Sequence, residues 1–322
     1  MGQADIPTLE SGLPMFLSAD KVYGSLIGSV LADAIGACFE GLPVNKLRSQ
    51  FSGKLAAFDY GVTRDSLNYT DDGEMTLALA EYLAENHTII SRELMRRFVQ
   101  TYQSWRGYGR GTRVLIEAFR DNAEYEFMAS HLFPGGSLGN GAAMRSAPVG
   151  LRFHGDTSKL WEEAKQSAWP THRHELGIEG AQLIALATSL AATVTEITPS
   201  RLADLLLPSC STVVFQNRLA RLAKSESDAD IEQFGNGIEA HESVVTALAC
   251  FALYPTDYRS AVATAIWQGG DTDTIASMTG ALVGAHLGSA FADALPVERL
   301  EEGPEFIGYV RGLAERLAAS KY

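Results

Sequence analysis

Two short clusters of threonine and aspartate, far apart in the chain, each stand directly before a long apolar segment. Residues 70–72 read "TDD" before "GEMTLALAEYL", and residues 269–274 read "GGDTDT" before "IASMTGALVGAHLG". A carboxylate at a helix N-terminus is favoured by free backbone N–H groups and by the helix dipole, so capping explains either cluster alone. Two adjacent aspartates nevertheless exceed what one cap requires, and in an extended segment Asp271 and Asp273 project to the same side.

The two clusters together offer six hard oxygen ligands, which suit Mg²⁺, Mn²⁺ or Ca²⁺ rather than zinc. If the two helix starts converge, four carboxylates face one another, and such a group is costly without compensation. One or two divalent cations would remove that cost. The pattern therefore predicts a metal site formed by Thr70, Asp71, Asp72, Asp271, Asp273 and Thr274.

A glycine-rich segment is a second candidate site. Residues 133–151 read "FPGGSLGNGAAMRSAPVGL", with four glycines before an apparent helix at Ala142. Backbone N–H groups in such a loop can bind phosphate, although a plain glycine loop is an equal alternative. The segment matches neither the Walker A pattern nor GxGxxG. Glu40 and His172 are isolated polar residues, and such residues are by themselves more often solvated or structural than catalytic.

Helical periodicity runs through most of the chain, and alternating strand patterns are scarce. We therefore expect an all-α fold, with residues 1–18 as a tail and residues 19–322 as one domain. Small residues recur at every fourth position over 24–36 and again over 276–288. Glycine costs about 1 kcal/mol relative to alanine inside a helix, so this repetition predicts two tightly packed helices, each a candidate partner for the other.

The composition argues against several classes of partner and of structural site. The chain has 322 residues, 46% of them hydrophobic, and a net charge of −13, which disfavours nucleic acid or an anionic membrane as a partner. An anionic ligand would have to be held by metal ions, backbone N–H groups or isolated basic residues. Three cysteines without a CxxC pattern argue against structural zinc and against disulfides. We find no signal-peptide pattern and no stretch of about 20 apolar residues, so we expect a cytoplasmic protein, and a monomer.

Several segments carry a family resemblance. The chain contains, in this order, "GSLIGSVLADAIGACFEG", "YTDDGEMTLALA", "GGSLGNGAAMR", "TH" at 171–172, "FGNGIEAHESVVTALACF" and "GGDTDTIASMTGALVGAHLG". From about residue 20 to about residue 290 the sequence resembles the ADP-ribosylglycohydrolase family. "RGYGRG", "GSLGNG" and "FGNGI…SV" are most similar to its ADP-ribosyl-serine hydrolase branch, which also degrades poly-ADP-ribose.

The resemblance implies a compact all-α domain of orthogonal helices around a central binuclear centre of two Mg²⁺ ions, with Mn²⁺ as an alternative. Thr70, Asp71, Asp72 and Asp273 would hold one ion, and Asp271, Asp273 and Thr274 the other. Glu40 matches a glutamate on a mobile flap over the metals. The implied substrate contacts are Gly107, Tyr108, Gly109, Phe133, Gly136, Ser137, Leu138, Gly139, Asn140, His172 and Ile238.

The reaction implied by the resemblance is hydrolysis at C1″ of ADP-ribose attached to protein, with serine favoured as the acceptor, or linked in poly-ADP-ribose. ADP-ribose would be the product, and either Glu40 or Asp72 would move the proton. Arginine-linked ADP-ribose and O-acetyl-ADP-ribose remain alternative substrates. A non-enzymatic ADP-ribose-binding module is a more distant alternative. A terpenoid-synthase-like site is disfavoured because its DDxxD pattern would need Asp where Met75 stands.

Overall fold

The computed structural model describes residues 17–121 and 125–320, and this part of the chain is all-α, as predicted. It contains no β-strand, only the isolated bridges Leu67–Leu300 and Gly139–Glu239. Of the predicted tail at 1–18, only Leu17 and Ser18 fall within the described residues, and the Ser18 side chain caps the first helix.

The helices are short to medium in length and follow one another closely. The α-helices are α1 (Ala19–Gly36), α2 (Val44–Gln50), α3 (Lys54–Val62), α4 (Asp71–Glu85), α5 (Ser91–Thr101), α6 (Arg110–Arg120), α7 (Tyr125–His131), α8 (Ala147–Arg152), α9 (Thr157–Ala168), α10 (Glu175–Thr193), α11 (Pro199–Leu206), α12 (Val213–Leu222), α13 (Ala240–Leu253), α14 (Tyr258–Trp267), α15 (Thr272–Leu287) and α16 (Gly303–Ala319). The 3₁₀ helices are η1 (Ala37–Phe39), η2 (Asn140–Ala142), η3 (Leu207–Ser209), η4 (Asp228–Phe234), η5 (Ala290–Ala294) and η6 (Val297–Arg299).

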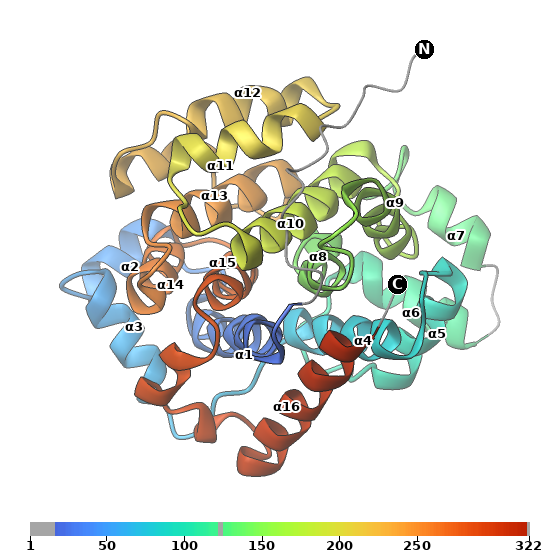
Figure 1. Cartoon of the computed structure of the whole chain (residues 1–322), viewed down its shortest axis with the longest axis horizontal. Coiled ribbons are helices and arrows are strands. Elements are labelled where there is room, and N and C mark those ends of the chain that lie inside the picture. Colours follow the sequence, from blue (N-terminus) through green and yellow to red (C-terminus); the bar gives the residue numbers. More distant parts are fainter. Residues whose placement is uncertain (1–16, 122–124, 321–322) are drawn as a thin grey trace.

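Helices α1 and α15 lie side by side at the centre of the molecule (Figure 1). Their glycines meet, because a Cβ atom added at Gly284 would lie 2.0 Å from the backbone oxygen of Gly24, and one at Gly280 would lie 2.2 Å from that of Gly28. The small-residue stripes therefore pack on each other, as the sequence suggested. The hydroxyl oxygens of Ser29 and Ser277 lie 2.9 Å apart within this contact.

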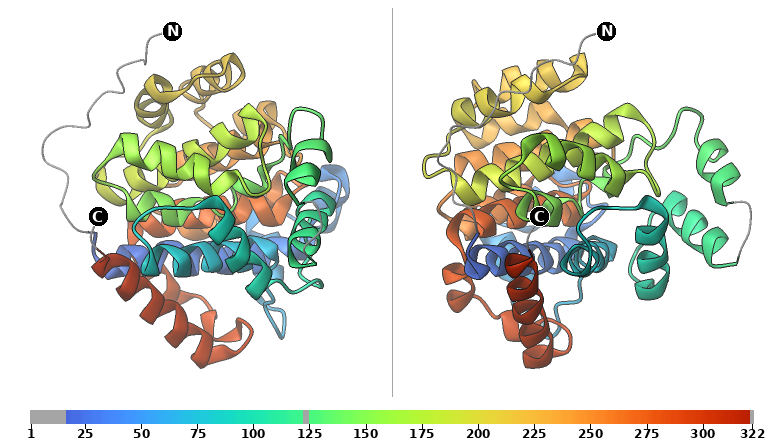
Figure 2. Two further views of the ribbon diagram at one scale, coloured as in Figure 1. Left: turned by 90° about the vertical axis from the view of Figure 1, so that its right-hand side faces the viewer. Right: turned by 45° about the vertical axis from the view of Figure 1, so that its right-hand side comes forward.

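The other helices surround this pair and hold the ends of α4 and α15 in place. Helix α16 packs on α1 and α4, while α10, α13 and α14 pack on α15 (Figure 1). Helices α5, α6 and α7 extend along one edge of the molecule, where α6 packs between the other two (Figure 2). The loops that precede α4, α6 and α15 thus come from different parts of the chain.

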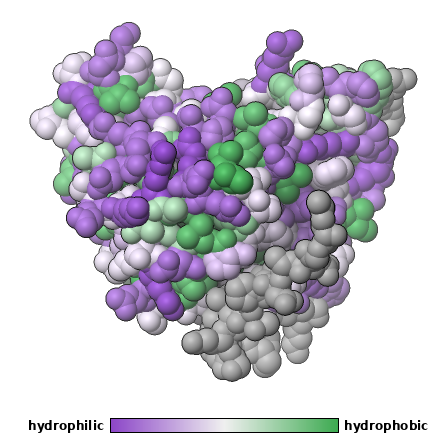
Figure 3. All heavy atoms as spheres, turned by 90° about the horizontal axis from the view of Figure 1, so that it is seen from above, coloured by the Kyte–Doolittle hydropathy of each residue, from purple (hydrophilic) through white to green (hydrophobic). Residues whose placement is uncertain are grey.

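Within the described residues, two helices are long and apolar enough to cross a membrane by length and composition alone, which the sequence expectation did not foresee. They are Ala19–Phe39 and Glu175–Thr193, and 89% and 83% of their apolar windows are buried inside the molecule. Their apolar character is explained by packing in the core, where α1 and α10 each contact α15. Viewed from above, the surface shows small apolar patches separated by polar side chains (Figure 3).

Candidate active site

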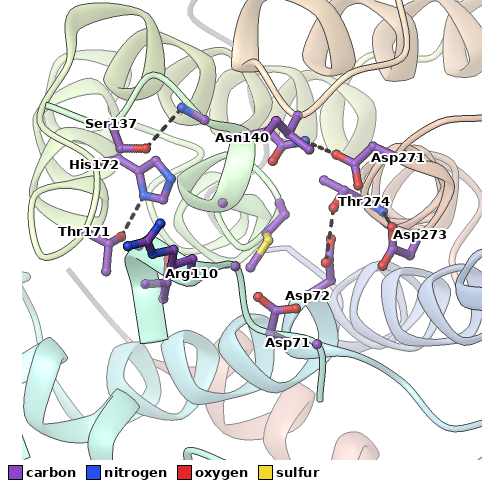
Figure 4. A pocket seen from close by; sticks show the side chains of 18 of the residues that line it. Asp71, Asp72, Arg110, Ser137, Asn140, Thr171, His172, Asp271, Asp273 and Thr274 are labelled. Atoms are coloured by element: carbon purple, nitrogen blue, oxygen red, sulfur yellow. Dashed lines mark hydrogen bonds between the residues drawn. The ribbon is translucent and has the colours of Figure 1, made fainter. Parts of the chain in front are cut away.

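The N-terminal ends of α4 and α15 open into one cleft of about 370 Å³ (Figure 4). Fourteen of the predicted site residues line it, although they come from seven separate stretches of the chain. These residues are Glu40, Asp71, Asp72, Gly107, Gly109, Phe133, Ser137, Gly139, Asn140, His172, Ile238, Asp271, Asp273 and Thr274. The convergence of the two Thr/Asp clusters, which the sequence could only suggest, is thus present in the fold.

Four predicted residues do not line the cleft. The buried Tyr108 side chain points away from it and donates its hydroxyl hydrogen to Glu74 over 2.5 Å. Leu138 accepts a backbone hydrogen bond from the first residue of α13. Gly136 adopts a positive φ of 91° in a turn that packs against residues 173–174. Thr70 lies behind the cleft, with its hydroxyl directed at neighbouring carboxylates.

The two acidic clusters meet through side-chain contacts. Thr274 Oγ1 lies 3.3 Å from Asp72 Oδ2, and Thr70 Oγ1 lies 3.3 Å from the same oxygen. Helix α4 begins at Asp71, so Asp71 and Asp72 belong to its first turn. There the free N–H groups and the helix dipole favour negative charge.

Asp33, on α1, supports this arrangement from below. It accepts hydrogen bonds from the backbone N–H groups of Thr70 (2.9 Å) and Gly73 (2.8 Å), and its Oδ1 lies 2.8 Å from Thr70 Oγ1. Three contacts to one buried carboxylate fix the start of α4 relative to the central helix. Asp33 therefore orients the cluster without lining the cleft.

Burial and mutual repulsion favour the protonated forms of these carboxyls. Burial raises the pKa of Asp33 to about 7, although hydrogen bonds from Thr70 and Gly73 oppose the change. Burial and the charge of Asp33 raise the pKa of Asp71 to about 8. The pKa values of Asp72 and Asp273 are raised well above the ordinary value by burial and then by neighbouring carboxylates. A cluster of this kind needs protons or cations to balance its charge.

The donor atoms fit a hard divalent cation. The buried Oδ1 of Asp72 has no hydrogen-bond partner within residues 17–121 and 125–320, and an unpartnered buried carboxylate oxygen is costly. Every predicted ligand atom is an oxygen, which suits Mg²⁺ or Mn²⁺. Among the described residues, however, no group of three or more His, Cys, Asp or Glu side chains is already arranged to hold an ion. Metal binding would therefore require threonine oxygens or movement of the carboxylates.

The loop before α15 owes its shape to two glycines. Gly269 and Gly270 both have positive φ values, of 66° and 70°, and a Cβ atom at Gly270 would lie 2.3 Å from the backbone oxygen of Asn236. Gly270 exchanges backbone hydrogen bonds with the segment after Glu40, accepting from Gly41 (2.8 Å) and donating to Leu42 (3.2 Å). Glu40 is thereby held beside Asp271, and burial together with the Asp271 charge raises its pKa.

The glycine-rich loop reaches the acidic cluster through Asn140. The Asn140 side-chain amide donates to Asp271 Oδ2 at 2.5 Å and to Ser243 at 3.0 Å. The apparent helix at Ala142 is only a 3₁₀ turn there, and α8 begins at Ala147, because Pro148 is tolerated only in a first turn. His172 is buried against this loop, and burial followed by the charge of Arg145 lowers its pKa to about 3.

Comparison with known sequences explains why the two Thr/Asp clusters and the glycine-rich loop occur together in one chain. The sequence pattern of the ADP-ribosylglycohydrolase family matches residues 17–322. The chain belongs to the ADP-ribosylglycohydrolase family. Its curated relatives include ADP-ribosylhydrolase ARH3 of Danio rerio, 32% identical over 86% of this chain and 84% of that protein. ADP-ribosylhydrolase ARH3 of Homo sapiens is also 32% identical, over 84% of this chain and 86% of its own length.

More distant similarities agree with this assignment. The uncharacterized protein YegU of Escherichia coli is 27% identical over 88% of this chain and 92% of its own length. A solved structure described as an ADP-ribosylglycohydrolase-related protein complex has the same fold, with a TM-score of 0.69 and 22% identity over 93% of this chain and 97% of that one. As a member of the family, this chain is a glycohydrolase that acts on ADP-ribosyl groups.

Six further residues line the cleft of this ADP-ribosylglycohydrolase and were absent from the predicted set. They are Arg110, Gly111, Thr112, Gly141, Met144 and Thr171. Arg110, Gly111 and Thr112 are the first three residues of α6. The sequence "RGYG" directly before them could have indicated that they lie near the site. Met144 and Thr171 fall within "GGSLGNGAAMR" and "TH", two of the segments that carry the family resemblance, but the sequence alone assigned neither residue a role in the site. Their positions follow only from the way η2 and the segment after α9 pack together.

Proposed function

We propose that this chain is a metal-dependent hydrolase that cleaves the bond at C1″ of ADP-ribose attached to protein, with serine as the first acceptor to test, or linked in poly-ADP-ribose. ADP-ribose is released. The observation that carries this proposal is the convergence of Asp71, Asp72, Asp271 and Asp273 on one cleft, beside a glycine-rich loop. Two curated relatives whose names describe them as ADP-ribosylhydrolases support the same reaction class.

Two Mg²⁺ ions, or Mn²⁺ in their place, are the cofactors that this donor set fits. Thr70, Asp71, Asp72 and Asp273 would hold one ion, and Asp271, Asp273 and Thr274 the other. Such ions supply charge neutralisation and Lewis-acid polarisation, which allow them to bind sugar hydroxyls and activate water. The unpartnered Asp72 oxygen and the raised carboxyl pKa values are the observations in support.

The rest of the cleft suits the ADP part of the ligand. Backbone N–H groups of the loop at 137–140 and the Ser137 hydroxyl would bind the diphosphate, while the Asn140 side chain holds the loop against Asp271. Phe133 and Ile238, which are 40% and 68% exposed, provide apolar contact area for the adenine at the cleft rim. Arg110 adds a positive charge to the lining of an otherwise acidic protein.

Glu40 is the residue proposed to move the proton. It lines the cleft from an exposed position, whereas Asp72 is buried and is assigned to the ions. Partial loss of solvent contact within the cleft, followed by the Asp271 charge, raises the pKa of Glu40, which brings it closer to the range useful for general acid–base catalysis. Asp72 is the alternative, and the Glu40 variant described below distinguishes them.

The acceptor is tested by a direct comparison of substrates. Purified protein is assayed on ADP-ribosyl-serine peptide, ADP-ribosyl-arginine, poly-ADP-ribose and O-acetyl-ADP-ribose, each with Mg²⁺ and with EDTA. The expected result is fastest release of ADP-ribose from the serine peptide or the polymer, abolished by EDTA. Full activity in EDTA would refute the metal-dependent mechanism. Binding of ADP-ribose without turnover of any of the four substrates would favour the binding-module alternative.

A further inference from the structure

Arg145 is a fully buried guanidinium group close to the cleft, with 0% of its surface exposed. Its terminal nitrogens donate to the backbone oxygens of Gly141 and Ser167 and to the side chain of Thr171, and its planar group lies over the Phe98 ring. Within residues 17–121 and 125–320 it forms no ion pair, and its Nε has no hydrogen-bond partner. Burying a cation without a carboxylate partner is costly, so packing alone does not account for this arginine.

The hydrogen bonds of Arg145 lead to His172 through one hydroxyl group. Thr171 Oγ1 accepts from Arg145 Nη2 at 2.9 Å. The same oxygen lies 2.7 Å from His172 Nδ1 (Figure 4). In the described part of the chain, His172 Nδ1 is the one acceptor within reach of the Thr171 hydroxyl hydrogen. If Nδ1 carried the ring proton instead, that buried hydroxyl hydrogen would have no acceptor among the described residues. The contacts therefore assign the proton to Nε2.

The other ring nitrogen of His172 faces the glycine-rich loop. A Cβ atom at Gly141 would lie 2.9 Å from Cε1 and 3.2 Å from Nε2, and one at Gly139 would lie 3.4 Å from Nε2. These glycines leave space for the ring at the wall of the cleft, and across the described residues Nε2 has no hydrogen-bond partner. A free N–H donor therefore faces the place where the loop would bind phosphate.

The ring also stays neutral over the working pH range. Burial lowers its pKa to about 3, and the adjacent Arg145 charge acts in the same direction. The other charged or titratable groups that line the cleft are Glu40, Asp71, Asp72, Arg110, Asp271 and Asp273. A neutral imidazole with a protonated Nε2 binds an acceptor, such as a phosphate oxygen, without changing the charge of the site.

We propose that Arg145 is a positioning residue that acts through Thr171 to hold His172 as the Nε2–H tautomer, so that the cleft presents a fixed donor to a phosphate oxygen of the ligand. The identity of the ligand as ADP-ribose rests on the proposed function. The tautomer is a property of the protein alone. Loss of the hydrogen bonds that run from Arg145 through Thr171 is expected to change which ring nitrogen of His172 carries the proton. The His172 side chain itself remains in place.

The tautomer is tested by nuclear magnetic resonance on the protein labelled with ¹⁵N-histidine. Long-range ¹H–¹⁵N spectra distinguish protonated from unprotonated ring nitrogens, and loss of signals in His172→Gln assigns the residue. The expected result is an unprotonated Nδ1 and a protonated Nε2 from pH 5 to pH 8. A protonated Nδ1 in the wild-type protein would overturn the proposal.

Variants of Thr171 interrupt the hydrogen bonds between Arg145 and His172 without removing the buried arginine. Thr171→Val abolishes the hydroxyl, and mixed tautomers or titration within that pH range are expected. Thr171→Ser keeps the hydroxyl and is expected to restore the wild-type spectrum. An unchanged tautomer in Thr171→Val would show that the hydroxyl does not set it. Arg145→Met is expected to shift the tautomer as Thr171→Val does. If Arg145→Met fails to fold, the comparison of Thr171→Val with Thr171→Ser still tests whether the hydroxyl sets the tautomer.

Calorimetry with ADP-ribose separates this proposal from the proposed function. Thr171→Val is expected to bind ADP-ribose about five- to tenfold more weakly than wild type, the loss typical of one hydrogen bond, while Thr171→Ser binds normally. Wild-type affinity in Thr171→Val would refute the link between the tautomer and ligand binding. If the wild-type protein itself does not bind ADP-ribose, the proposed function fails, whereas the tautomer measured without ligand still stands.

Discussion

Thr274 at the start of α15 and Asp72 in the first turn of α4 meet with 3.3 Å between Oγ1 and Oδ2, although they are 202 positions apart in the chain. This contact joins the two Thr/Asp clusters into one site. Helix capping alone would have required no such meeting, because each helix end could have been satisfied separately. The contact is therefore the best structural argument for a shared cation site.

Asp273→Asn is expected to lower kcat/KM by at least roughly a hundredfold, because the proposed bridging carboxylate would contact both ions and the substitution removes its charge. The measurement is initial-rate kinetics on the preferred substrate at saturating Mg²⁺. Asp65→Asn, at an exposed position away from the cleft, is the matched control and is expected to keep normal rates. Near-normal turnover in Asp273→Asn would contradict the bridging role.

Glu40→Gln is expected to reduce kcat by about 10²- to 10⁴-fold while leaving ADP-ribose affinity close to normal, because the amide keeps the shape of the side chain but cannot transfer a proton. Single-turnover kinetics and calorimetry measure the two quantities separately. A large loss of affinity with unchanged kcat would instead give Glu40 a structural or binding role, and would leave Asp72 as the candidate for proton transfer.

Asp33→Asn is expected to weaken Mg²⁺ binding by roughly 10- to 100-fold, since residues that orient metal ligands commonly have effects of this size. The variant replaces one of the two oxygens that accept hydrogen bonds from Thr70 and Gly73 with an NH₂ group. Titration of the metal-free protein with Mg²⁺, followed by the rise in melting temperature, gives the affinity. An unchanged Mg²⁺ affinity would show that α4 is positioned without Asp33.

The metal-free protein is expected to lose stability as the pH rises from about 4 to about 8. The reason is that the pKa values of Asp33 and Asp71 are raised in the folded state, to about 7 and about 8, above the unfolded value of about 3.9. The folded state therefore binds more protons in this range, and rising pH favours unfolding. Urea unfolding at several pH values measures the slope of the free energy of unfolding against pH.

Saturating Mg²⁺ is expected to raise stability most at the higher pH values, and Asp71→Asn should make the slope of the metal-free protein shallower. An equally steep slope in Asp71→Asn would contradict the assignment.

Gly284→Ala is expected to destabilise the fold by about 1–3 kcal/mol, because the new methyl group would lie 2.0 Å from the Gly24 backbone oxygen at the central helix contact. Gly308→Ala on α16 is the control, since a Cβ atom there meets nothing within 4 Å, and it is expected to be stabilising by up to about 1 kcal/mol. Urea unfolding of both variants measures the free-energy changes. If the two variants had equal free energies of unfolding, α1 and α15 could move apart with little loss of stability.

The sequence by itself determined the helical class, the apolar stripes of the helices and the chemical type of the proposed metal ligands. These properties are local, since they depend on residue type and on periodicity within one segment. The four-residue repeat of small residues even indicated the α1–α15 contact, because repeated glycine destabilises a helix unless a closely packed neighbour needs the space.

Only the tertiary structure decided which residues meet. Thr274 and Asp72 meet although they are 202 positions apart, and the Tyr108 side chain points away from the cleft. The buried residues Arg145 and Thr171 form a hydrogen-bonded chain to His172. Such contacts depend on how whole helices pack, and residue type along the chain carries little information about that geometry. A motif could suggest His172, but the link from His172 through Thr171 to Arg145 is visible only once the turn before α8 and the segment after α9 have been brought together.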